Sequence, residues 1–186
     1  VVTLDRAANG GSVETHIASD NIAGGKMAGE YVVEQLGGKG NIVELEGIAG
    51  SSAARDRGQG FEEGIKGSEL KLASKQTADF DRTKGLSVME NILQGNSDIK
   101  AVFAQNDEMA LGAQKALADK GMNDVIIVGF DATDDAVKAV KEGKMAATVA
   151  QQPDLIGSLG IETAIKLINK EKVEKFIPVE LQLITK

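Results

Sequence analysis

The fold is decided by Phe103-Ala-Gln-Asn-Asp-Glu-Met-Ala-Leu-Gly-Ala113 and by Val125-Ile-Ile-Val-Gly-Phe-Asp131, which follows it. In both stretches an apolar run ends on a polar side chain, Asn106 in the first and Asp131 in the second. In an open α/β sheet, the carboxyl ends of parallel strands border the crevice in which ligands bind. Two hydrogen-bonding groups at such strand ends predict a binding site for a small polar ligand, recognised by its hydroxyl groups.

Short runs of β-forming residues alternate with longer stretches of helical periodicity along the whole chain. This alternation predicts an α/β protein with a parallel sheet and helices on both faces. The predicted strands are 1–4, 41–46, 70–76, 101–104, 125–130, 146–150 and 179–184. The predicted helices are 22–36, 82–93, 107–120, 133–141 and 153–168, with Asp81 and Asp107 as acids that can cap the first turn.

Composition narrows the classes of function. The chain has 186 residues, a net charge of −7 and no cysteine. The acidic balance argues against nucleic acid as a partner, and the absence of cysteine removes thiolate catalysis and cysteine metal sites. No apolar run approaches the roughly 20 residues of a membrane-spanning helix. Val1–Asp5 has the pattern of a buried strand that is already under way, so we expect the chain to be a fragment or one part of a divided protein.

Arginines follow the small-residue loop Gly47–Ser52 at the start of a further predicted helix. Arg55 or Arg57 can add a fork of donors to the backbone N–H groups there. A solvated surface pair is the alternative, and we expect a ligand role for one of the two. Gly58-Gln-Gly60 lies inside the helix, so it is not a dinucleotide fingerprint.

Other candidate ligand contacts lie at comparable strand ends. Phe80 follows a predicted strand, and its ring could stack on the apolar face of a sugar or pack in the core. Asp5 and Arg6 end the first strand, where they form a surface ion pair or contact the same ligand. Gln151 follows the strand 146–150.

Motifs of catalysis are absent from the sequence. His16 is the only histidine and is more typical of a structural residue than of a base or a metal ligand. The sequence contains neither a Gly-x-Ser-x-Gly elbow nor His-Glu-x-x-His. We therefore expect a binding protein without enzymatic activity, with no cofactor and no metal ion.

Taken together, these stretches resemble the periplasmic sugar-binding proteins of bacterial ABC importers. The resemblance runs from Leu4-Asp-Arg6 through the loop at Gly47, Ala78-Asp-Phe-Asp-Arg82 and the two stretches quoted first to the last strand, and so covers essentially the whole chain. It implies the periplasmic binding protein type 1 fold. It also implies a ligand set of Asp5, Arg6, Arg57, Asn106, Asp131 and Gln151 as hydrogen-bonding residues and Phe80 as the stacking residue, which selects Arg57 over Arg55.

The resemblance further implies D-ribose or a similar pentose as ligand and a membrane permease of an ABC importer as partner, with a chemotaxis receptor as a further candidate partner. It implies a periplasmic or extracellular lipid-anchored location for the full-length protein. It implies a second, carboxyl-terminal lobe at 20–151, hinge crossings and remnants of the first lobe at 1–19 and 152–180, and a returning strand at 181–186. With most of the first lobe missing, the hydrogen-bonding groups stay wet, so this chain alone is expected to bind ribose weakly if at all.

Two other functions share parts of this pattern. The effector-binding core of a LacI-type transcriptional repressor has the same fold, but it should carry a basic DNA-binding helix-turn-helix, and the acidic balance disfavours it. An enzyme that acts on a sugar or a sugar phosphate is the second alternative. A phosphate ligand would need more basic groups in the loops than the sequence places there.

Overall fold

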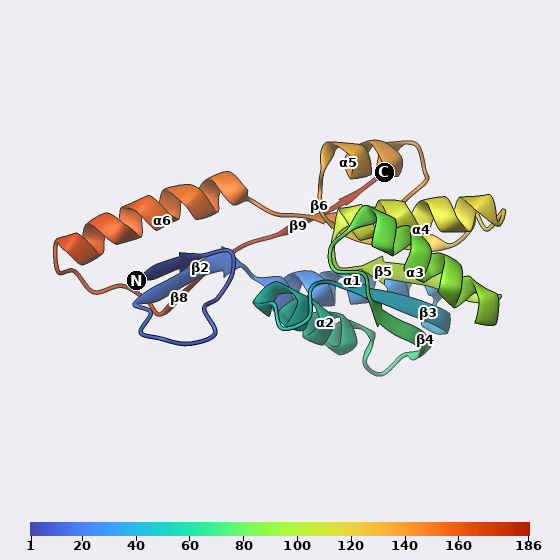
Figure 1. The fold of residues 1–186 in the computed structure, drawn as a ribbon, viewed down its shortest axis with the longest axis horizontal. Helices are drawn as coiled ribbons and strands as arrows, with labels where there is room; N and C mark the ends of the chain where they lie inside the picture. The colour runs from blue at the N-terminus through green and yellow to red at the C-terminus, as the bar shows by residue number, and fades with distance from the viewer.

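A computed structural model describes residues 1–186 and contains two sheets at opposite ends of an elongated molecule (Figure 1). The larger sheet has the strand order β4-β3-β5-β6-β7-β9, and the smaller one has the order β1-β2-β8. Their bounds are β1 (Val2–Leu4), β2 (Thr15–Ser19), β3 (Lys39–Glu46), β4 (Glu69–Thr77), β5 (Ile99–Ala104), β6 (Ile126–Asp131), β7 (Ala147–Ala150), β8 (Phe176–Val179) and β9 (Gln182–Thr185). All pairings are parallel except that of β7 with β9.

Helices cover both faces of the larger sheet, as the sequence predicts. The helices are α1 (Asn21–Leu36), α2 (Ser52–Ile65), α3 (Arg82–Gly95), α4 (Asp107–Asp119), α5 (Asp134–Lys141) and α6 (Pro153–Ile168). Successive side chains of a strand point to opposite faces. Phe103 of β5 accordingly joins the core beneath α1 and α2, while its neighbour Val102 joins the core beneath α3, α4 and α5. The predicted fold class is confirmed.

The chain passes between the two ends of the molecule three times. The crossings lie between β2 and α1, between β7 and α6, and between β8 and β9. The last crossing corrects one prediction, because 179–184 is not a single strand. Val179 ends β8 in the smaller sheet, Glu180 and Leu181 cross, and Gln182 starts β9 antiparallel to β7.

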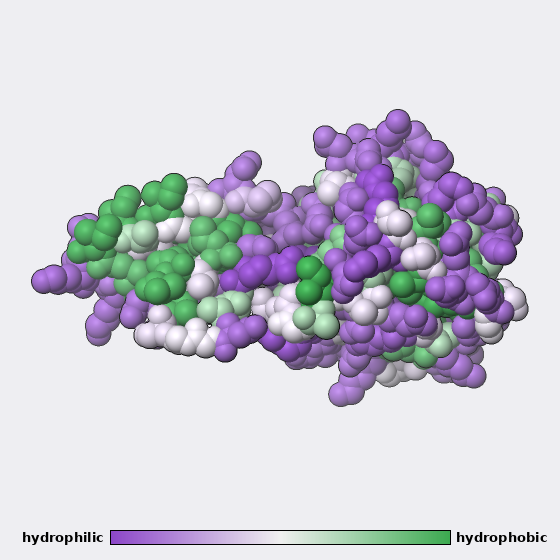
Figure 2. All heavy atoms as spheres, in the orientation of Figure 1, coloured by the Kyte–Doolittle hydropathy of each residue, from purple (hydrophilic) through white to green (hydrophobic).

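The smaller sheet and α6 form a thin layer with much apolar surface. Ile156 of α6 packs on Ile17 and Val179, but Ile161 is 67% exposed and Ile168 is 78% exposed. Figure 2 shows hydrophobic residues gathered over this end of the molecule. The first strand is not buried as its sequence suggests, because β1 is an edge strand and its residues are half-buried or exposed. None of the helices combines the length and apolar character needed to span a membrane.

Candidate functional site

The predicted ligand residues gather at the carboxyl edge of the strands, beside the crossings. Asp5 and Arg6 follow β1, Arg57 lies in α2 after β3, Phe80 follows β4, Asn106 follows β5, Asp131 ends β6, and Gln151 follows β7. Contacts connect all of them, as the next paragraphs describe. The structure thus brings the predicted set to one place, although the role of each residue toward a ligand stays a prediction.

Arg57 lies at the centre of this group and is only 3% exposed. Its Nε donates to Asn21 Oδ1 at 2.8 Å, and its Nη1 donates to the backbone oxygen of Gln105 at 2.6 Å. The same Nη1 lies 3.6 Å from Asp131 Oδ1, and the guanidinium lies over the ring of Phe130, 3.7 Å from its centroid. These contacts leave Nη2 for a ligand.

Burial shifts the pKa values of Arg57 and Asp131, the central pair of the site, in the directions that favour their neutral forms. Desolvation lowers the pKa of Arg57 to about 10, although Asp131 opposes the shift. Desolvation also raises the pKa of Asp131, although Arg57 and the hydrogen bond from Gln151 oppose it. For each group, the effect of burial on the pKa is larger than that of the opposite charge. The interactions within the protein therefore compensate only part of the desolvation of the pair. A ligand that hydrogen-bonds to the charged forms would supply the missing compensation.

Gln151 connects Asp131 to a crossing segment. Its Nε2 donates to Asp131 Oδ1 at 2.6 Å, and its Oε1 accepts from Ser19 Oγ at 2.7 Å. The contacts of Asp131 with Gln151 and Arg57 involve only one of its two carboxylate oxygens, Oδ1. Asp131 Oδ2 therefore remains as an acceptor for a hydroxyl group.

Phe80 lies against the backbone at the end of β3. A Cβ atom added to Gly47 would stand 2.0 Å from Phe80 Cζ, so only glycine allows the ring to pack there. Arg6 lies over the ring at 5.0 Å from its centroid, and Arg57 does so at 5.9 Å. Arg6 also donates to Ser51 Oγ at 3.0 Å and pairs with Asp5 at 3.2 Å. A ring that stacks on Phe80 would share this aromatic face with the arginines.

Asn106, and not Asp107, caps α4. The predicted cap, Asp107, is instead the first residue of α4, and Asn106 is the N-cap. Asn106 Oδ1 accepts from the backbone N–H of Met109 at 3.0 Å, and its Nδ2 donates to the backbone oxygen of Phe80 at 3.2 Å. Only one N–H of its amide is left for a ligand. Asp81 caps α3 as predicted and accepts from Lys84 N.

Sequence reasoning missed a buried polar chain beneath the site. Gln105 accepts from the backbone N–H of Gly47 at 2.8 Å through Oε1 and donates to Glu44 Oε1 at 2.7 Å through Nε2. Lys75 lies 3.2 Å from Glu44 Oε2. Desolvation raises the pKa of the fully buried Glu44, and Lys75 partly offsets that shift. A charged residue inside the apolar run of β3 was the signal that could have revealed this chain.

The two remaining candidates fall outside the site. Arg55 is exposed and pairs with Asp56 at 3.0 Å, which agrees with the choice of Arg57. His16 lies in β2, where its Nδ1 shares a hydrogen bond of 2.9 Å with Thr3 Oγ1 and its ring stacks on Phe176.

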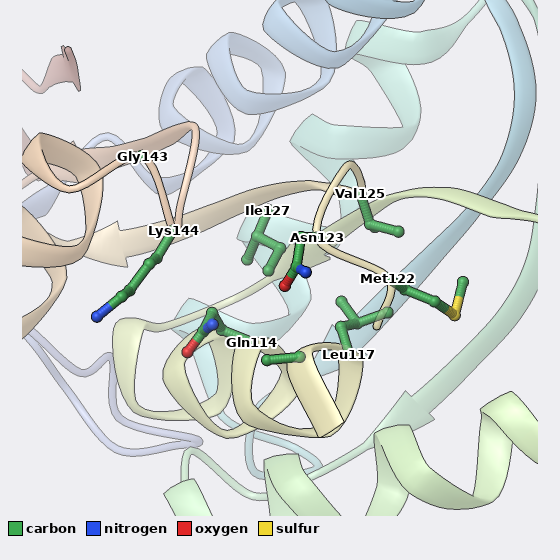
Figure 3. A pocket seen from close by; sticks show the side chains of 9 residues that line it. Gln114, Leu117, Met122, Asn123, Val125, Ile127, Gly143 and Lys144 are labelled. Carbon is green, nitrogen blue, oxygen red and sulfur yellow. The ribbon is translucent and has the colours of Figure 1, made fainter. Parts of the chain in front are cut away.

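Two of the hollows on the surface differ in their position relative to the predicted ligand residues. One of about 430 Å³ lies between the sheets and is lined by Asp5, Asp131 and Gln151 together with Leu4, Pro153, Ile156 and Gly157. Another, of about 210 Å³, lies at the amino end of β6, where Leu117, Met122 and Ile127 form its wall and Gln114, Asn123 and Lys144 border it (Figure 3). The first is lined by three of the seven predicted ligand residues, Asp5, Asp131 and Gln151, so we take it as the candidate ligand site.

An open, mostly parallel sheet with hydrogen-bonding groups at its carboxyl edge suits the binding of a small solute. Residues 1–172 match the family model described as a periplasmic binding protein domain. The chain belongs to this family.

Three similar proteins are informative. The ribose import binding protein of Haemophilus influenzae is 59% identical over 185 residues, which are 100% of this chain and 63% of that protein. The ribose import binding protein of Escherichia coli is 54% identical over 186 residues, with 100% and 63% coverage. A solved solute-binding protein of an ABC transporter from Bacillus halodurans, with bound myo-inositol, superposes with a TM-score of 0.91 at 36% identity, covering 99% of this chain and 65% of that one. The chain thus spans less than two thirds of the length of these relatives.

Proposed function

We propose that this chain supplies the larger part of the sugar-binding cleft of an ABC importer's substrate-binding protein, with D-ribose or a similar pentose as ligand. The observation that carries the proposal is the Arg57–Asp131 pair. Arg57 is buried and Asp131 is half-buried, burial shifts the pKa of each against its charged form, and Asp131 lines a hollow between the two sheets. The names of the relatives support ribose among the polyhydroxylated ligands.

The chemistry of such a site is recognition without bond making. A pentose hydroxyl can donate to Asp131 and accept from Arg57 at the same time. An analogue that lacks this hydroxyl would leave both groups desolvated and unpaired, which is the strongest source of discrimination available to a polar site. Stacking on Phe80 would add contact with the apolar side of the sugar ring.

The division of the chain into lobes is part of the proposal. We assign 20–151 to one lobe, 1–19 and 152–180 to the crossings and to part of a second lobe, and 181–186 to a strand that returns to the first of these. The exposed apolar face of α6 and the coverage of only 63% of the relatives support this assignment. A segment like the part of the relatives that this chain does not match would cover that face and close the cleft. In a periplasmic importer the closed form would bind a membrane permease, and a chemotaxis receptor is a further candidate partner.

The test is a titration with D-ribose of this chain alone and of the chain mixed with the unmatched part of the Haemophilus influenzae relative. Alone, the solvated groups gain little from exchanging water for sugar. We expect NMR shifts only at high millimolar ribose for the chain alone, and micromolar binding by calorimetry for the mixture. Asp131→Ala should abolish binding, whereas Asp98→Ala, at the opposite edge of the sheet, should leave it unchanged. Micromolar binding by the chain alone would contradict the two-lobe proposal, and binding that survives Asp131→Ala would contradict the site.

A further inference from the structure

The turn that carries Asp131 has an unfavourable backbone conformation. Asp131 has φ of 118° and Ala132 has φ of 55°. Two successive non-glycine residues with positive φ persist only where the surrounding structure holds them. This turn joins β6 to α5 and contributes the acceptor at the centre of the candidate site.

Two fully buried side chains hold the turn from below. Asp107 Oδ2 accepts from the backbone N–H of Thr133 at 2.7 Å and from its hydroxyl at 3.2 Å. Asp107 Oδ1 accepts from Thr148 Oγ1 at 2.7 Å, and Thr148 Oγ1 accepts from the backbone N–H of Ala132 at 3.2 Å. Asp107 and Thr148 are each 0% exposed.

The fold makes room for this arrangement. A Cβ atom on Gly129 of β6 would stand 2.2 Å from Asp107 Oδ1. The helix α4 does not require Asp107 as a cap, because Asn106 already accepts from the first turn. An acid in a first helical turn is ordinarily solvated, but here burial raises the pKa of Asp107 to about 6, and the nearby Asp131 adds to the rise. Burial of the Asp107 carboxylate therefore costs free energy, and helix capping does not account for its position.

We propose that Asp107 and Thr148 are positioning residues of the ligand site. They hold residues 131–133 in a conformation that the turn alone disfavours, and so fix the direction of the Asp131 carboxylate relative to Arg57 and Gln151. The inference rests on the proposed function, since it takes Asp131 as the acceptor of a ligand hydroxyl. Neither Asp107 nor Thr148 needs to touch the ligand.

The first test, carried out without ligand, asks whether Thr148 stabilises the turn at residues 131–133. Thr148→Val keeps the shape of the side chain but removes the hydroxyl, and Thr148→Ser keeps the hydroxyl as the matched control. We expect amide hydrogen exchange at Ala132 and Thr133 to become at least roughly ten-fold faster in the valine variant, because the hydroxyl's two hydrogen bonds, one from Ala132 N–H and one to Asp107, are lost. The serine variant should exchange as the wild type does. Unchanged exchange in the valine variant would overturn the positioning role, whether or not the protein binds a sugar.

The effect on binding is tested in the preparation that binds D-ribose. Thr148→Val should weaken binding roughly ten-fold and should cause no further loss in a background of Asp131→Glu, where the carboxylate is already displaced. Equal losses in both backgrounds would mean a general structural effect and would overturn the proposal. If the valine variant fails to fold, Asp107→Asn, which keeps its shape and one acceptor, takes its place with the same expectations. Full ribose binding by Asp131→Ala would instead refute the proposed ligand site. The hydrogen-exchange result would still show whether Thr148 holds the turn.

Discussion

Gly47→Ala is the substitution that separates ligand recognition from stability most sharply. The new Cβ would stand 2.0 Å from Phe80 Cζ and 2.2 Å from its Cε1. Ordinary contact begins near 3.4 Å, so the ring must retreat by roughly 1.4 Å or rotate away. Phe80 is the predicted stacking residue, and Arg6 lies over the same ring, so the shift reaches the site directly.

The expected cost to stability is small. Overpacking costs about 1–3 kcal/mol in a closed core, but Phe80 is half-buried on a loop, so the ring can yield and the lower end applies. Gly47 does not have positive φ, and replacing such a glycine by alanine stabilises a protein by about 0.4–1 kcal/mol through the unfolded chain. The two terms nearly cancel, and we expect the unfolding free energy to change by less than about 1 kcal/mol.

The expected cost to binding is larger. Loss of an aromatic contact of this kind amounts to about 1 kcal/mol, which together with displacement of Arg6 corresponds to roughly ten-fold weaker ribose binding. Urea denaturation gives the stability, and calorimetry on the preparation that binds ribose gives the affinity. Gly95→Ala is the matched control, because no atom lies within 4 Å of its added Cβ.

Two results would refute this reasoning. The first is wild-type ribose affinity in Gly47→Ala, which would mean that the position of the ring does not matter for the ligand. The second is an equal loss of affinity when Phe80 has already been replaced by alanine, which would mean that the loss does not pass through the ring.

Three further expectations concern charge and exposed apolar surface. Arg57→Met leaves the half-buried Asp131 without its cation, and we expect urea melts to show a loss of about 3 kcal/mol, the lower end for a buried pair; a loss below about 1 kcal/mol would mean that water screens the pair. Because burial raises the pKa of Asp107 from 3.8 to about 6, the folded state binds this proton more tightly than the unfolded state does, so the associated stability is present below pH 4 and is lost as the pH rises through 6. Asp107→Asn should remove this loss of about 3 kcal/mol, and a wild-type–variant difference that is the same at pH 4 and pH 7 would contradict it. Ile161→Glu combined with Ile168→Glu should reduce concentration-dependent light scattering of the chain alone, and a wild type that is monomeric at high concentration would remove the basis for this expectation.

The sequence predicts those parts of the fold and site that depend on local pattern. Apolar runs that end on Asn106 and Asp131 are local signals, and both residues lie at the carboxyl edge as expected. The cap at Asp81 is equally local, since its side chain accepts from a backbone N–H three residues later. In such cases the neighbouring residues alone determine the conformation.

The features that the sequence did not predict depend on residues far apart in the chain. The split of 179–184 follows from the pairing of Val179 with Ser19 in one sheet and of Gln182 with Ala150 in the other. The burial of Asp107 depends on Thr148, which lies 41 residues away. The sequence pattern of a single segment cannot predict pairings between residues so far apart in the chain.

The Arg57–Asp131 pair shows how the proposed binding site would trade stability for recognition. Arg57 and Asp131 lie 3.6 Å apart, yet desolvation outweighs their attraction and shifts the pKa of each toward the neutral form. A closer, fully bonded pair would stabilise the free protein and leave nothing for a ligand to complete. Asp131 also has φ of 118°, a backbone conformation that persists only where the surrounding structure holds it. A ligand hydroxyl that bonds to both groups would stabilise their charged forms, so ligand binding should lower the pKa of Asp131 and raise that of Arg57.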